Sequence, residues 1–172
     1  MAKGLTRTSS PIQISATVLE TAGGAFTANE IDLTLNALDN EVFVITQVNL
    51  DLSLPNDPTG AGDINFSSAS LSSTARTTVG SIANANVIAA AQKVIGRNAA
   101  GNYFFDREDP LFAAQDMDYL GIVATSQMFL NVQGEGAAFT TPKRCNARIY
   151  GYRAKADSAT YAALVQSELL SS

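Results

Sequence analysis

The sequence predicts an all-β protein that ends in a single helix. Apolar and polar residues alternate along most of its segments, which is the pattern of half-buried strands. Clusters of Gly, Pro, Asn and Asp separate those segments, and clear helical spacing occurs only after residue 156. A length of 172 residues suits one domain with its own core.

The clearest strand is Glu41–Leu54. Its even positions are Val42, Val44, Thr46, Val48, Leu50, Leu52 and Leu54. Its odd positions are Glu41, Phe43, Ile45, Gln47, Asn49, Asp51 and Ser53. A helix would scatter the even positions around its circumference, so the alternation predicts one long strand. We expect a continuous apolar face on the even side and an odd side that becomes polar after Ile45.

Seven further segments bring the expected total to about eight strands. Four of them show alternation, and they are residues 12–20, 30–35, 120–132 and 145–156. The segment 66–79 fits an edge strand, a surface loop or both, and 82–95 fits either a strand or a short helix. A short aromatic run, Tyr103-Phe104-Phe105, is the last candidate.

The two ends of the chain differ from this pattern. Residues 1–10 predict a short arm that carries two positive side chains, Lys3 and Arg7. At the other end Asp157-Ser158 offers a helix N-cap. Apolar residues then recur at helical spacing, at Tyr161, Leu164, Val165 and Leu169. We therefore expect an amphipathic helix over residues 157–172, packed on the same domain.

Eight antiparallel strands with no alternating helices predict a jelly-roll-like β-sandwich over residues 11–156. An immunoglobulin-like sandwich needs fewer residues and usually has a Cys…Trp…Cys pattern. The chain has no Trp and a single cysteine, Cys145. Cys145 lies in an alternating run, which favours a small buried residue over a nucleophile.

Low charge favours a protein that contacts other protein over much of its surface. Charged residues make up 16% of the chain and hydrophobic residues 46%, whereas soluble domains average roughly 25% charged. The alternative is a monomer covered by its plentiful Ser, Thr, Asn and Ala. The net charge of −5 and the pI of about 4.6 argue against a nucleic-acid-binding protein.

Charge is also distributed unevenly along the chain. Between residues 8 and 75 there are eight acidic residues and no Lys or Arg. The basic residues near the end are Lys143, Arg144, Arg148, Arg153 and Lys155. Together with Lys3 and Arg7 they are the predicted subunit contacts, because acidic and basic regions complement each other between copies. Pairing within one fold, or simple solvation, explains the same pattern equally well.

The residues that enzymes most often need are missing. Without His there is no Ser-His-Asp or Cys-His system and no His-ligated zinc. The glycines form no phosphate-binding motif. We therefore expect no catalytic residues, no cofactor and no enzyme activity. Two loop pairs, Asp57 with Asp63 and Asp116 with Asp118, are weak calcium candidates, and only a site shared between subunits would supply enough ligands.

Location and nucleic-acid contact follow from the same features. No stretch approaches the roughly 18 apolar residues of a membrane helix, and residues 1–11 lack a secretion leader. We expect a chain made in the cytosol and not inserted in a membrane. Arg148, Tyr150 and Tyr152 share one face of the last strand, as single-strand binders do. The acidic remainder favours contact with a neighbouring subunit instead.

The short basic-tipped arm, the eight alternating strands and the Ser/Thr/Asn/Gly-rich loops resemble single jelly-roll viral coat proteins. The resemblance covers residues 11–156 and is architectural. It implies a non-enzymatic subunit that tiles the virion shell and binds copies of itself and other virion proteins. The arm departs from strongly basic coat arms, so the resemblance implies weak or absent contact with the genome.

Two other functions fit the same sequence. One is a subunit of a non-viral filament, tube or surface layer, in which the arm serves as a donated strand. The other is a carbohydrate-binding β-sandwich, since jelly rolls also occur among lectins. Aromatic residues that could stack on sugars in that case are Tyr103, Phe104, Tyr119, Tyr150 and Tyr152.

Overall fold

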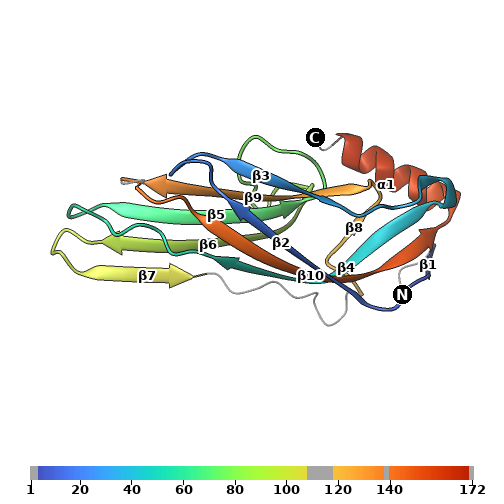
Figure 1. The fold of residues 1–172 in the computed structure, drawn as a ribbon, viewed down its shortest axis with the longest axis horizontal. Helices are drawn as coiled ribbons and strands as arrows, with labels where there is room; N and C mark the ends of the chain where they lie inside the picture. The colour runs from blue at the N-terminus through green and yellow to red at the C-terminus, as the bar shows by residue number, and fades with distance from the viewer. Residues whose placement is uncertain (1–3, 108–117, 138–139, 171–172) are drawn as a thin grey trace.

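The computed structural model describes residues 4–107, 118–137 and 140–170. The strands are β1 (Leu5–Arg7), β2 (Ile12–Leu19), β3 (Thr27–Asp32), β4 (Glu41–Leu52), β5 (Ile64–Ser72), β6 (Val87–Arg97), β7 (Tyr103–Arg107), β8 (Gly121–Val123), β9 (Gln127–Gly136) and β10 (Arg144–Ala156). A 3-10 turn, Ala37–Asp39, precedes β4, and helix α1 (Ser158–Leu170) follows β10 (Figure 1).

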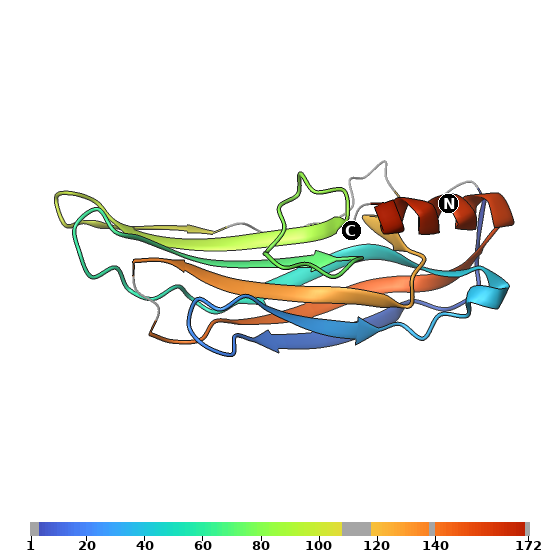
Figure 2. The ribbon, with the colours of Figure 1, turned by 90° about the horizontal axis from the view of Figure 1, so that it is seen from above.

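The strands form two antiparallel sheets that face each other. In sheet A, β10 lies between β4 and an edge made by β1 and β2, and β8 follows β4. In sheet B the order is β3-β9-β5-β6-β7. Figure 2 shows the elongated body with α1 at one end.

The pairing of the eight principal strands is nested, and this confirms the jelly-roll prediction. The first of them pairs with the last, β2 with β10, and the second with the last but one, β3 with β9. The third, β4, pairs with β8, and the two central strands β5 and β6 pair with each other. A long antiparallel hairpin rolled into two sheets has this pairing. The short strands β1 and β7 add to its edges.

The long strand β4 does not keep one apolar face, as the sequence predicted, because it contains a β-bulge. Tyr150 of β10 is opposite Gln47, but Gly151 is opposite Ile45, so Thr46 is an extra residue. An extra residue reverses the side to which the following side chains point. Phe43 and Ile45 therefore face the same core as the residues after the bulge, which are Val48, Leu50 and Leu52.

Two apolar cores result from this reversal. The main core lies between the sheets and includes Phe43, Leu71, Met128 and Ile149, all fully buried. A smaller core lies on the other face of sheet A, where α1 covers it. Its buried members are Leu5, Val42, Val44, Ala124, Ala154 and Ala156.

Helix α1 begins at the predicted cap. The Asp157 carboxylate accepts a hydrogen bond from the Thr160 amide at 2.7 Å, and this bond lowers the pKa of Asp157. Tyr161, Leu164 and Val165 pack against the smaller core, as predicted. Leu169 was expected on the same face, but it is 66% exposed. Glu168 occupies the buried position instead.

The structure also decides the segments that the sequence left open. Residues 66–79 contain most of β5 and then a loop, and 82–95 contain most of β6 rather than a helix. The aromatic run 103–105 begins β7. The segment 120–132 divides into β8 and β9, since a turn at residues 124–126 separates them.

The predicted arm is continuous with sheet A from residue 5 onward. β1 pairs with residues 154–156 of β10, and Leu5 is buried in the smaller core. Gly4 adopts a φ of 86°, and its carbonyl accepts a hydrogen bond from the Asp157 amide at 3.0 Å. An apolar side chain and backbone hydrogen bonds thus attach this segment to its own chain.

A substitution at Gly151 tests the close approach of β10 to β4. A Cβ at Gly151 would lie 2.3 Å from the Val44 carbonyl oxygen and 2.8 Å from the Phe43 ring. Because both contacts are too short, we expect Gly151→Ala to lower the free energy of unfolding by roughly 1–3 kcal/mol in urea titrations. Arg148→Ala, at an exposed position of the same strand, is the control. Equal losses in the two variants would contradict the close approach.

Candidate subunit-contact surfaces

The outer face of sheet A is a bare polar surface at the end away from α1. Arg148 lies between Ser15 and Asn49 on the neighbouring strands, and Asn146 lies between Thr17 and Asp51. These side chains line an open hollow of about 540 Å³. Both charge signs and several amides and hydroxyls are available there, so the surface offers donors and acceptors to a polar protein partner.

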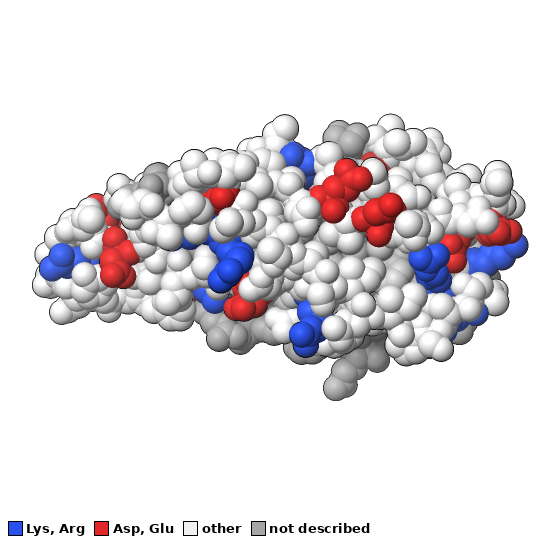
Figure 3. Space-filling view, in the orientation of Figure 1, with Lys and Arg blue, Asp and Glu red and all other residues white. Residues whose placement is uncertain are grey.

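Arg144 and Arg148 project from this face, as the predicted contact role requires. Both are exposed, and β10 carries them in the middle of sheet A, between β2 and β4. Asp51 of β4 is exposed on the same face. Figure 3 shows the molecule in the orientation of Figure 1. Few charged side chains lie on this side, and wide uncharged areas separate them.

Arg153 is used within its own chain. It forms an ion pair with Glu41 at 3.1 Å and donates to the Leu33 carbonyl oxygen at 2.9 Å. It also donates to the backbone oxygen of Thr34, which has a positive φ of 48°. Arg153 thus joins β4, β10 and the segment after β3, which is the pairing within one fold that the sequence left open.

Lys143 is buried, although it was predicted at a subunit contact. Its side chain is 4% exposed, and its ammonium donates to Asn56 and to the Leu54 carbonyl oxygen. Desolvation lowers the pKa of Lys143, and the nearby Glu20 carboxylate opposes this shift. The lysine therefore fixes the segment after β4 rather than meeting a neighbour.

Two more of the predicted contact residues, Lys155 and Arg7, are at the surface. Lys155 is more than half exposed and pairs loosely with Asp39, at 3.8 Å. Arg7 is exposed, and its guanidinium lies 4.6 Å from the centre of the Tyr152 ring. Lys3 lies outside the described residues. Arg7, Arg144, Arg148 and Lys155 are thus the ones placed where a neighbouring copy could reach them.

Two buried glutamates, which sequence reasoning missed, hold the ends of the sandwich. Glu20 accepts the amide of Gly134 and the amide of Lys143, each at 2.6 Å. Glu168 accepts the amides of Ala124 and Thr125, at 2.9 and 3.0 Å. Each carboxylate thus accepts hydrogen bonds from two backbone donors that would otherwise lack partners.

The spacing of both glutamates contained a signal. Glu20 continues the even positions of Ile12, Ile14 and Val18, which face the core. Glu168 lies three residues after Val165 and four after Leu164, on the inward side of α1. An acidic residue in phase with a buried face indicates a buried hydrogen-bonded carboxylate.

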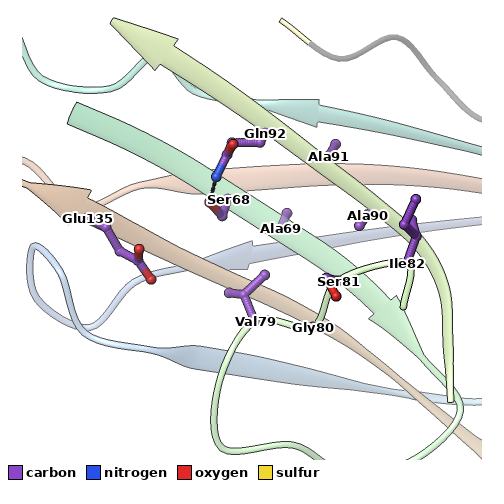
Figure 4. Close-up of a pocket in the computed structure, with 10 residues that line it drawn as sticks. All are labelled: Ser68, Ala69, Val79, Gly80, Ser81, Ile82, Ala90, Ala91, Gln92 and Glu135. Carbon is purple, nitrogen blue, oxygen red and sulfur yellow. Dashed lines mark hydrogen bonds between the residues drawn. The ribbon is translucent and has the colours of Figure 1, made fainter. Parts of the chain in front are cut away.

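A second hollow, of about 530 Å³, lies on the outer face of sheet B. Its floor is made of small side chains such as Ser68 and Ala90, and residues 79–82 form its wall. Figure 4 shows the hydrogen bond that Gln92 of β6 donates to Ser68 of the adjacent strand β5. The side chain of Glu135, on β9, also lines the hollow. Glu135 is its charged lining residue, so the hollow suits a neutral or cationic group.

The weak calcium candidates do not form a cluster among the described residues. Asp63 closes its own loop, since its carboxylate accepts the Gly60 amide at 2.7 Å and the Thr59 hydroxyl. Asp57 and Asp118 are exposed, and Asp116 lies outside the described residues. Nowhere in the described part do three His, Cys, Asp or Glu side chains converge on one point.

The aromatic residues considered for sugar stacking are in two groups. Tyr119 and Tyr152 pack against the smaller core, and Tyr150 is partly buried on β10. Tyr103 and Phe104 are largely exposed on β7, at 61% and 45%. The five residues therefore form no single stacking platform.

No protein-family model matches the chain, and no curated protein matches its sequence. Among the solved structures that are similar to it are three from viruses. Trichodysplasia spinulosa-associated polyomavirus VP1 has 7% identity and a TM-score of 0.38, with 91% of this chain and 96% of that one covered. Desmodium yellow mottle tymovirus has 8% identity and a TM-score of 0.30, with 83% and 87% covered.

The third structure is that of turnip yellow mosaic virus, with 9% identity, a TM-score of 0.26 and 88% and 99% of the two chains covered. All three structures come from viruses, the class of source that the resemblance stated from the sequence led us to expect. Because all three TM-scores are below 0.5, the jelly-roll assignment depends on the strand pairing within this chain. No helix among the described residues is long and apolar enough to cross a membrane.

Substitution of Glu168 tests the role of its carboxylate. Glu168→Ala leaves two backbone donors without acceptors, so we expect a loss of roughly 2–4 kcal/mol in the free energy of unfolding. Glu168→Gln keeps one acceptor and should lose less. Urea titration is the measurement, and Glu135→Ala, at an exposed position, is the control. A Glu168→Ala variant as stable as this control would refute the role.

The thiol of Cys145 should be inert in the folded chain. Cys145 is fully buried, and desolvation raises the pKa of its thiol to about 12, with a further contribution from Asp51. We expect no reaction with a thiol reagent at pH 8 until urea unfolds the chain, followed by one equivalent. Rapid labelling of the native chain would contradict this burial.

Proposed function

We propose that the chain is a structural subunit of a virus shell that assembles with copies of itself. The observation that carries the proposal is the complete nested jelly-roll pairing, with β1 and α1 closing one end of the body. A fold alone does not specify a function. The surface of the subunit therefore supplies the second part of the argument.

Large apolar side chains are exposed at several separate places on this surface. Leu38 is 96% exposed on the 3-10 turn, Ile82 76% on the loop before β6, and Leu170 79% at the end of α1. Apolar groups in different directions suit a subunit that contacts several neighbours, as a shell requires. The low content of charged residues, 16%, fits burial of much of the surface in such contacts.

The proposed partners are copies of this chain and other virion proteins, and the proposed location is the virion. Arg7, Arg144, Arg148 and Lys155 are proposed as polar contacts at the rims of the interfaces, where charges act mainly on orientation. With a net charge of −5, the subunit would hold nucleic acid weakly or not at all. We propose no catalytic role and no cofactor.

Light scattering coupled to size-exclusion chromatography tests the proposal. We expect the purified full chain to elute as large particles or as discrete oligomers that convert to particles at higher concentration and salt. Electron microscopy of the same fractions should show closed shells. Filaments or tubes would support the alternative assembly. A chain that stays monomeric over this range would refute self-assembly.

A second function, binding of a neutral sugar, is favoured by the hollow of Figure 4. Its volume of about 530 Å³ is within the usual range for small-molecule sites. Glu135, Gln92 and Ser68 would supply hydrogen bonds to hydroxyl groups. Titration of the chain with neutral hexoses, followed by NMR, separates the two functions. Shifts confined to these residues that disappear in Glu135→Gln would support sugar binding.

A further inference from the structure

Strand β7 forms an aromatic edge of sheet B. It pairs with β6, and no other strand in the described part of the chain pairs with it. Three consecutive aromatic side chains are exposed on it, Tyr103 at 61%, Phe104 at 45% and Phe105 at 54%. A free edge with apolar side chains is a site at which another strand can be added.

The other sheet edges do not share this character. β3, at the opposite edge of sheet B, carries the polar residues Asn29 and Glu30, both exposed. β8 has three residues, and the β1–β2 edge is interrupted at residues 8–11 before Ile12. Because aromatic–aromatic pairs across two strands are stabilising, the described edge that best complements β7 is β7 itself.

The pairing with β6 shows which side chains lie on each face of β7. Tyr103 is opposite Arg97 and Phe105 is opposite Ile95, on the side where Lys93 reaches the Leu52 carbonyl oxygen of sheet A. Phe104 lies on the other side, over Gly96, where a Cβ would meet its ring at 2.0 Å. Aromatic rings are therefore available on both faces of the edge.

We propose that β7 pairs antiparallel with β7 of a second copy, around a twofold axis that passes beside Phe104. In this register Phe104 meets Phe104, and Tyr103 of each copy meets Phe105 of the other. Directly opposite residues then share a face, so the five strands of sheet B in each copy continue into one sheet. The inference takes from the proposed function that the partner is a second copy.

Charge and area are consistent with this partner. In the proposed register the charged side chain of Asp106 is opposite the uncharged Asn102, so like charges do not face each other. At about half exposure each aromatic side chain would bury on the order of 100 Å², so six of them give about 600 Å². This is below the roughly 1,200 Å² of a stable interface. The pairing is therefore a weak contact that acts together with others.

Disulfide trapping tests the register. Phe104→Cys places the same thiol on both sides of the twofold axis, so mild oxidation should convert most of the chain to a disulfide-linked dimer on a non-reducing gel. Tyr103→Cys alone should stay monomeric. A mixture of Tyr103→Cys with Phe105→Cys should cross-link, because these positions are opposite each other. The natural Cys145 is buried and does not compete.

Leu38→Cys is the matched control, since Leu38 is 96% exposed and lies outside β7. Dimer yield for Phe104→Cys no higher than for Leu38→Cys would overturn the pairing, as would equal yields for all three β7 variants. Particle formation is scored separately. Particles without cross-linking refute the β7 contact and leave the shell proposal intact. Cross-linked dimers without particles support the β7 contact and refute the shell proposal.

Discussion

The architecture depends on one extra residue in β4, Thr46. Its hydroxyl donates to the Tyr150 carbonyl oxygen at 3.2 Å, at the point where the pairing register with β10 shifts. Before it, Val42 and Val44 face α1, and after it Val48 and Leu52 face sheet B. Without the bulge, Val42 and Val44 would lie on the same face as Val48 and Leu52. The bulge therefore lets a single strand serve two cores and makes the helix part of the domain.

Buried carboxylates complete what apolar packing leaves open. Near one end of the sandwich, Glu20 binds the amides of Gly134 and Lys143 and so connects β9 of sheet B with the start of β10 in sheet A. Near the other, Glu168 binds amides in the turn between β8 and β9 and fixes α1 to it. Without these carboxylates the backbone donors would be buried and unpaired, which costs about 1–3 kcal/mol each. Acidic residues thus stabilise the fold although the chain is acidic overall.

The local sequence pattern predicted most of the fold, but it predicted little about which residues lie at the surface. Alternation located the strands, and the Asp157 cap located α1, because both depend on neighbours in sequence. The bulge at Thr46 was not predictable, since the even positions of Glu41–Leu54 remain apolar on both sides of it. Lys143 pairs with Asn56 and Arg153 pairs with Glu41. These partners are distant in the sequence, so residue spacing did not reveal that the two basic side chains bind within their own chain. Lys143 and Glu20 show that charge alone does not place a residue at the surface.

The residues that hold the fold together differ from those that we propose for assembly. Both cores are closed within one copy, and even the arm contributes Leu5 to its own chain. The aromatic edge of β7 and the outer arginines of β10 belong to neither core. Burying them does not hold the subunit together, so they are free to adapt to neighbours. Contacts made from such groups are individually weak, and many weak contacts permit a shell to correct misplaced subunits before it closes. The proposed subunit, with both cores closed within one copy and its proposed contacts outside them, would meet that requirement.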